Sequence, residues 1–89
     1  MAWRIEYTSV AVKNLSNLDP QAAKRILRFI DERILPSSDP RSLGEALHGV
    51  LGDLWKYRVG SHRIIARIED RRLVILILRI GARRDVYRL

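Results

Sequence analysis

The clearest structural signal in the chain is the stretch Leu54-Trp-Lys-Tyr-Arg-Val-Gly-Ser-His-Arg-Ile-Ile-Ala-Arg-Ile68. Apolar and polar residues alternate in residues 54–59 and, more weakly, in residues 62–68, which is typical of strands with one buried face. Gly60 and Ser61 between them form a two-residue loop of the kind that joins tight hairpins. The stretch therefore predicts a β-hairpin whose two strands run antiparallel.

The register of this hairpin decides which side chains share a face, because side chains alternate along each strand. One face is apolar and predicts a core, whereas the other carries Lys56, Arg58, Arg63 and Arg67. Arg58 lies directly opposite Arg63, and like charges there cost up to about 1 kcal/mol. A solubilising face is the alternative interpretation, but an anion bound between the two guanidiniums would relieve the conflict. Lys56, Arg58 and Arg63 are therefore candidate anion-binding residues.

Two further segments are expected to form strands. Residues 73–80 are almost all apolar, which is typical of a central strand covered on both faces. Residues 3–7 alternate like a half-buried strand. A turn of even length at residues 69–72 would place every second side chain of the apolar strand on the Arg58 side, as a strip without visible cover. Such strips usually mark interfaces, and the residues of this one are Val74, Leu76, Leu78 and Ile80.

The helical signals lie between the first strand and the hairpin. Residues 8–18 carry apolar side chains at helical spacing after a possible Thr or Ser cap. Asp19 is a good N-cap and Pro20 suits the first position of a second helix, which ends before Pro36. Residues 42–52 show no sustained period. The order β-α-α-β-β-β predicts an α+β fold, with two N-terminal helices packed on one face of a small antiparallel sheet.

Length and charge narrow the range of functions. The chain has 89 residues and a net charge of +7, so we expect a single domain over residues 1–89. Residues 45–89 hold ten Lys or Arg and five Asp or Glu, a net of +5, against seven and five, a net of +2, in residues 1–44. The usual partner of such a charge is a polyanion. Without cysteine, a secretory signal or a long apolar run, we expect a cytoplasmic protein that does not enter the membrane.

Several kinds of catalytic site have no signature in the sequence. No Ser-His-Asp set, glycine-rich phosphate loop or cluster of metal ligands is evident, so neither a metal nor another cofactor is expected. A basic segment follows the last strand, with Arg83, Arg84 and Arg88 around Tyr87. A basic cleft with a phenol could still cleave RNA, because the 2′-hydroxyl supplies the nucleophile and the protein need only orient it and stabilise charge.

The sequence resembles the RelE toxins of bacterial type II toxin–antitoxin systems, within the RelE/ParE superfamily. The resemblance extends over nearly the whole chain, and its most specific part is the ordered set of residues 54–65, 73–81 and 83–88. It implies a RelE-like fold in which a small antiparallel sheet is flanked by two N-terminal helices. It also implies a ribosome-dependent mRNA endonuclease that cuts A-site mRNA by 2′-hydroxyl attack, leaves a 2′,3′-cyclic phosphate, and inhibits translation.

The resemblance also assigns roles to residues. Tyr87 would help to activate the 2′-hydroxyl, and Lys56, Arg58 and Arg83 would hold the scissile phosphate. Arg63 would assist the leaving 5′-oxygen. Arg58 stands where the family usually has lysine, which keeps the charge but makes proton transfer there doubtful. The remaining cations, expected to contact mRNA or ribosomal RNA, are Arg67, Arg84 and Arg88.

The implied partners are the 70S ribosome, mRNA and a cognate RelB-like antitoxin. A helix of the antitoxin is expected to cover the strip of Val74, Leu76, Leu78 and Ile80. Two other functions stay open: a ParE-like toxin that acts on DNA gyrase, and a basic module that binds RNA without cutting it. Both share the predicted charge, but the first generally lacks the catalytic cations, and the second predicts salt-dependent binding alone.

Overall fold

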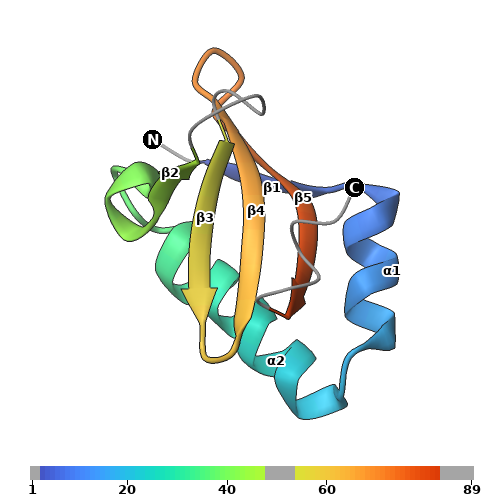
Figure 1. Cartoon of the computed structure of the whole chain (residues 1–89). Coiled ribbons are helices and arrows are strands. Elements are labelled where there is room, and N and C mark those ends of the chain that lie inside the picture. The colour runs from blue at the N-terminus through green and yellow to red at the C-terminus, as the bar shows by residue number, and fades with distance from the viewer. Residues whose placement is uncertain (1–2, 48–53, 83–89) are drawn as a thin grey trace.

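The computed structural model describes residues 3–47 and 54–82 and places five strands in one sheet (Figure 1). In chain order they are β1 (Arg4–Tyr7), β2 (Glu45–Leu47), β3 (Leu54–Val59), β4 (His62–Glu69) and β5 (Val74–Ala82). The spatial order is β1-β5-β4-β3-β2. Strand β1 runs parallel to β5, and the other neighbouring pairs are antiparallel. The α+β class is confirmed, although the sheet is mixed rather than wholly antiparallel.

Two features of the sheet were not predicted from the sequence. Strand β2 has three residues and lies at the edge, so it is too short to show alternation. The parallel pairing of β1 with β5 joins the first and last strands. Alternation identifies a strand but carries no information about the direction of its neighbour, so this pairing leaves no signature in a single sequence.

The two helices begin where capping residues predict. Helix α1 (Ser9–Asn17) starts after Thr8, whose hydroxyl oxygen accepts the Ala11 N–H at 3.0 Å. Helix α2 (Pro20–Phe29) starts after Asp19, whose carboxylate accepts two backbone N–H groups. The helix continues as a π-helical turn, η1 (Ile30–Ile34). No helix in the described part of the chain is long and apolar enough to cross a membrane.

Both helices cover the same face of the sheet and bury one apolar core there (Figure 1). Ile26, Ile30 and Ile34 follow one another at intervals of four residues along α2 and η1, and each is fully buried. They pack with the inward side chains of β3, β4 and β5, including Tyr57 and Ile64. Each such side chain contributes about 1.5–3 kcal/mol on transfer from water. No helix in the described residues covers the opposite face of the sheet, which is called the outer face below.

A β-bulge in β5 changes which residues reach that outer face. Ile65 pairs with Arg79, whereas the next residue, Ala66, pairs with Ile77, so Leu78 is the extra residue. The prediction that Ile80 lies on the Arg58 side is wrong, because the extra residue shifts it into the core, where it is 2% exposed. The same shift places Arg79 on the outer face, where its charge need not be buried.

Side chains before and within α1 stabilise the backbone at the bulge and two residues beyond it. The Thr8 hydroxyl donates to the Leu78 carbonyl at 2.8 Å, and Asn14 Oδ1 accepts the Ile80 N–H at 3.0 Å. Backbone groups that lack a ladder partner are costly when buried, so these contacts favour the bulged form of the strand.

Candidate functional site

The predicted hairpin register is confirmed, and it places two arginines opposite each other. Arg58 on β3 pairs with Arg63 on β4, and Arg63 pairs with Gly81 on β5. These three residues form one row across the outer face next to the β3–β4 turn. Because Gly81 has no side chain, this row carries side chains only from β3 and β4.

A second row lies one step further from the turn. It runs from Glu45 on β2 through Lys56 and Ile65 to Arg79 on β5. Lys56 and Arg79 therefore extend the cationic surface, while Ile65 separates them and is 5% exposed. An arginine inside a run of apolar residues is hard to place in a core, and this is the sequence signal that could have indicated Arg79.

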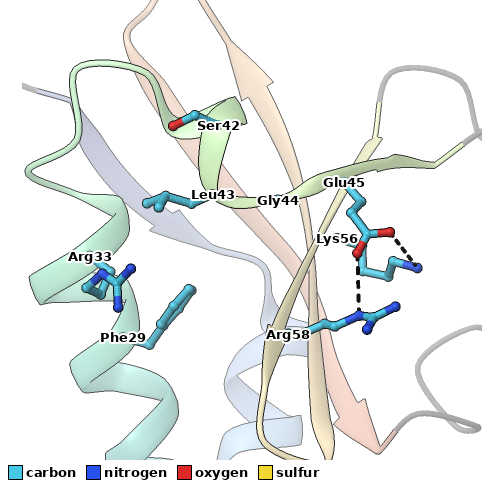
Figure 2. A pocket seen from close by; sticks show the side chains of 8 residues that line it. All are labelled: Phe29, Arg33, Ser42, Leu43, Gly44, Glu45, Lys56 and Arg58. Carbon is cyan, nitrogen blue, oxygen red and sulfur yellow. Dashed lines mark ion pairs between the residues drawn. The ribbon is translucent and has the colours of Figure 1, made fainter.

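Glu45 is a component of the site that the sequence did not reveal. Its carboxylate lies 3.8 Å from Lys56 Nζ and 3.5 Å from Arg58 Nε. Figure 2 marks both ion pairs with dashed lines. The side chains of Glu45 and Arg58 are 58% and 61% exposed, so solvent weakens this contact, whereas that of Lys56 is 18% exposed. One carboxylate thus serves two cations and partly relieves the repulsion between Arg58 and Arg63.

Arg63 is the most buried of the three candidate cations, at 9% exposed. Its Nη1 donates to the carbonyls of Gly60 and His62, at 3.2 and 2.9 Å. No carboxylate in the described residues lies within ion-pair distance of it. Backbone carbonyls hold the guanidinium in place while its charge is left without a described counter-ion, which is suitable for binding an external anion.

A cavity of about 330 Å³ opens beside Lys56 and Arg58 at the β2 edge of the sheet (Figure 2). Arg33 from η1 points towards it, with its guanidinium 5.8 Å from the centre of the Phe29 ring. Gly44 forms part of the wall by close packing, because a Cβ there would lie 2.8 Å from the Lys56 carbonyl oxygen. The full lining is Phe29, Arg33, Ser42, Leu43, Gly44, Glu45, Lys56 and Arg58.

The two tyrosines in the described residues belong to the core side. Burial raises the pKa of Tyr57 to about 12, and its hydroxyl donates to the Pro40 carbonyl at 2.8 Å. Burial, followed by the charge of Asp31, also raises the pKa of Tyr7. Neither tyrosine is suited to act as a phenolate on the outer face.

The other predicted site residues are divided between the described and undescribed parts of the chain. Arg67 is exposed on the outer face, opposite Leu54. Four predicted site residues, Arg83, Arg84, Tyr87 and Arg88, lie outside the described residues. No group of three His, Cys, Asp or Glu side chains within residues 3–47 and 54–82 could hold a metal ion.

The predicted apolar strip is only partly present on the outer face. Leu76 and Leu78 are half-buried there, whereas Val74 is fully buried and offers no surface. Ile80 belongs to the core, as described above. Leu78 instead joins a separate apolar cluster that the sequence did not predict as a unit, formed by Leu47, Leu54, Ile65 and Leu78.

The fold is that of a small α+β protein with a mixed five-stranded sheet, both helices on one face and a row of cations on the other. The family model described as the ParE toxin of type II toxin–antitoxin systems, parDE, matches residues 5–87. The chain therefore belongs to the RelE/ParE superfamily of type II toxins, which confirms the resemblance in the sequence.

Known proteins support this assignment in sequence and in structure. The chain is 28% identical to Toxin RelG of Mycobacterium tuberculosis over 88 residues, which are 99% of each chain. The structure of the RelBE2 toxin–antitoxin complex of the same organism matches with a TM-score of 0.84 and 25% identity, covering 93% of this chain and 100% of the other. The RelE–RelB complex of Pyrococcus horikoshii matches with a TM-score of 0.69 and 26% identity, covering 96% and 99%.

Proposed function

We propose that this type II toxin is a ribosome-dependent endonuclease that cuts mRNA in the ribosomal A site. The observation that carries the proposal is the placement of Lys56, Arg58 and Arg63 in adjacent rows on the outer face of the sheet. A phosphate diester bound there would face three cations, whereas Glu45 is the only carboxylate that the described residues pair with them. Arginine forks and a lysine ammonium are the side chains that hold phosphate oxygens best.

The proposed reaction needs no nucleophile from the protein. The 2′-oxygen of one nucleotide attacks the adjacent phosphorus and loses its proton, and the bond from phosphorus to the 5′-oxygen breaks. The products are a 2′,3′-cyclic phosphate and a 5′-hydroxyl, which takes up a proton. Lys56 and Arg58 would hold the charge that develops on the phosphate oxygens. Arg63, fixed by two carbonyls, would stabilise the leaving oxygen.

Two further residues belong to this proposal through the family resemblance. Strand β5 ends at Ala82, which pairs with His62 next to Arg63. Arg83 is the next residue of the chain, and we propose that it binds the same phosphate. Tyr87 would orient or deprotonate the 2′-hydroxyl, a role for which neither described tyrosine is placed.

The remaining cations and apolar residues have proposed partners as well. Arg67 and Arg79 on the outer face, with Arg84 and Arg88, would contact ribosomal RNA or mRNA. The cluster of Leu47, Leu54, Ile65 and Leu78, with Leu76 beside it, would receive an apolar segment of the cognate antitoxin. Both matched structures described above are complexes of a toxin with its antitoxin, which supports this partner.

The test is a reconstituted translation reaction with purified protein, read by primer extension on the mRNA. We expect cuts within A-site codons for the wild-type chain. Lys56→Gln keeps the aliphatic stem and removes the charge, so cleavage should fall by about 100-fold, the usual loss for one charge-stabilising group. Arg71→Gln, which removes an exposed cation at the opposite turn, is the matched control and should cut like the wild type.

A second candidate function follows from the description of the matching family model as a ParE toxin. It is inhibition of DNA gyrase. Intact mRNA in the translation reaction, together with gyrase-dependent DNA breaks, would overturn the nuclease proposal in favour of this function. Salt-dependent RNA binding with neither activity would indicate a binding module alone.

A further inference from the structure

A second positively charged hollow lies on α2 and shares no lining residue with the cavity beside Lys56. Its volume is about 300 Å³. The residues that line it are spaced by three or four positions, so they share one face of the helix. They are Gln21, Lys24, Arg25 and Arg28.

The charges of this hollow are poorly balanced. Arg28 Nε lies 3.5 Å from a Glu32 carboxylate oxygen, but the two side chains are 76% and 67% exposed, so solvent screens the pair. Within the described residues, Lys24 and Arg25 take part in no ion pair. Three cations on one helix face repel one another, and a bound anion would relieve that repulsion.

The hollow is connected to the outer face through the tip of the β3–β4 hairpin. Helix α2 passes next to this tip in Figure 1, and Arg25 Nη1 lies so close to Gly60 that a Cβ there would be 3.2 Å from it. The carbonyl of Gly60 accepts a hydrogen bond from Arg63 on the sheet side. Arg25 and Arg63 thus flank one residue, and the cationic surface continues around the tip from the helix to Arg58.

The lining of the hollow distinguishes between possible occupants. Docked protein segments are held mainly by aromatic and aliphatic anchors in apolar pockets. No apolar side chain is among the four lining residues, which offer an amide, an ammonium and two guanidiniums. Guanidinium forks match phosphate oxygens in geometry as well as in charge.

We propose that this hollow is a second phosphate-binding site, which holds the RNA backbone at a distance from the bond that is cut. The proposal deepens the proposed function, because it makes the RNA path run from the outer face around the hairpin tip onto α2. The site would contribute to affinity for RNA, whereas the chemistry would depend on the outer face alone.

The experiment measures binding of a fluorescein-labelled stem–loop RNA by fluorescence anisotropy at several salt concentrations. The RNA is 2′-O-methylated throughout, so it lacks the nucleophile and cannot be cut. The test variant is Lys24→Gln/Arg25→Gln/Arg28→Gln. The control is Arg4→Gln/Lys13→Gln/Arg71→Gln, which removes the same charge from exposed positions elsewhere.

The proposal predicts a change in salt dependence and not merely in affinity. Each lost phosphate contact lowers the slope of log K against log salt by about one. For the test variant, the slope of log K against log salt should fall by about two, and the affinity for RNA at low salt should fall at least about tenfold. Both changes should be much smaller for the control variant.

The outcomes separate this site from the proposed function. Equal slopes for the test and control variants would overturn the second site, even if mRNA is cut normally. A lost slope in the test variant would support the site even if no cleavage is found. A third outcome is that the test variant binds RNA normally while the antitoxin no longer inhibits its cleavage of mRNA. That result would overturn the proposal and assign the hollow to an acidic protein segment.

Discussion

The two ends of the sheet use arginine in different ways. At the end where β4 turns into β5, Arg41 donates to both carboxylate oxygens of Asp70, at 2.9 and 2.7 Å. This pair raises the pKa of Arg41 and lowers that of Asp70. Arg72 similarly contacts Glu69 at 3.0 Å and Glu6 at 3.3 Å. We call this end the paired end.

At the end with the β3–β4 hairpin, called the hairpin end, described carboxylates are scarce. Lys56 and Arg58 share Glu45, and Arg63 donates to backbone carbonyls. The residue types at the two ends are similar, so composition alone does not distinguish them. The number of carboxylates within reach decides whether a cation is used in the fold or is available to a ligand.

The largest effect is expected when two cations are removed from one end of the sheet and the result is compared with the same removal at the other end. Lys56→Gln/Arg58→Gln at the hairpin end should lower mRNA cleavage by at least about 100-fold. Its free energy of unfolding should change by less than about 1 kcal/mol, because the contacts with Glu45 are partly exposed. Primer extension and urea unfolding measure the two effects.

The matched variant at the paired end is Arg41→Gln/Arg72→Gln. It should cut mRNA within about twofold of the wild type and be only slightly less stable, because its ion pairs are exposed to solvent. Equal loss of cleavage in both double variants would show that the two ends do not differ in function.

The next test disturbs the close packing of Gly44 against β3, which supports the hairpin end. Gly44→Ala places a Cβ 2.8 Å from the Lys56 carbonyl oxygen and 2.9 Å from Tyr57 Cε1, so either β2 or β3 must move. We expect a loss of about 1–3 kcal/mol in the free energy of unfolding. The contrasting variant is Gly60→Ala, which meets only the flexible end of Arg25 and costs about 1–2 kcal/mol through its positive φ of 60°. A Gly44→Ala chain as stable as the wild type would contradict the close packing.

A smaller effect is expected where Tyr57 anchors the segment before β2. Tyr57→Phe removes the hydrogen bond to the Pro40 carbonyl and should cost about 1 kcal/mol at neutral pH. The folded-state pKa is raised to about 12, above the usual value of 10, so the unfolded chain loses the phenol proton first as pH rises. Stability of the wild type should therefore fall between these two values, and Tyr57→Phe should lack this component. Urea titrations across that pH range measure it, and identical pH profiles would refute the assignment.

The smallest expected effect concerns the counter-ion at the hairpin end. Glu45→Gln removes the carboxylate that competes with phosphate for Lys56 and Arg58. RNA affinity should rise by about two- to fivefold, which corresponds to a partly exposed pair of up to about 1 kcal/mol. Glu6→Gln at the paired end is the control, and it should slightly lower stability without changing RNA affinity. Weaker RNA binding by Glu45→Gln would show that the carboxylate itself helps to bind RNA.

The parts of the fold that the sequence predicted are those set by residues close together in the chain. The hairpin register followed from Gly60 and Ser61, because a two-residue loop leaves one pairing that keeps the core face apolar. The cap at Asp19 was also predicted, and Thr8 was one of the two residues expected to cap the first helix, because a cap acts through residues only two or three positions away. Local signals of this kind can be recognised in a single sequence.

The missing parts depend on contacts between distant segments. Glu45 reaches the site through the edge strand β2, and three residues are too few to show a period. Arg79 and Ile80 exchanged their expected faces because of the bulge, which is set by pairing with β4 and not by any residue of β5 alone. Lys56, Arg58 and Arg63 were predicted from alternation, whereas Tyr87 and Arg83 entered only through the family resemblance.

The bulge determines how β5 would respond to the deletion of one residue. Leu78 is the extra residue, and without it Leu76, Ile77, Arg79 and Ile80 would alternate regularly with each side chain on its present face. A single deletion in the middle of a sheet normally reverses every later side chain, but here it would only straighten the strand. We therefore expect homologues one residue shorter at this point to keep the same fold, with the gap in their alignment at Leu78. The strand is thus a place where evolution can adjust the curvature of the sheet by one residue.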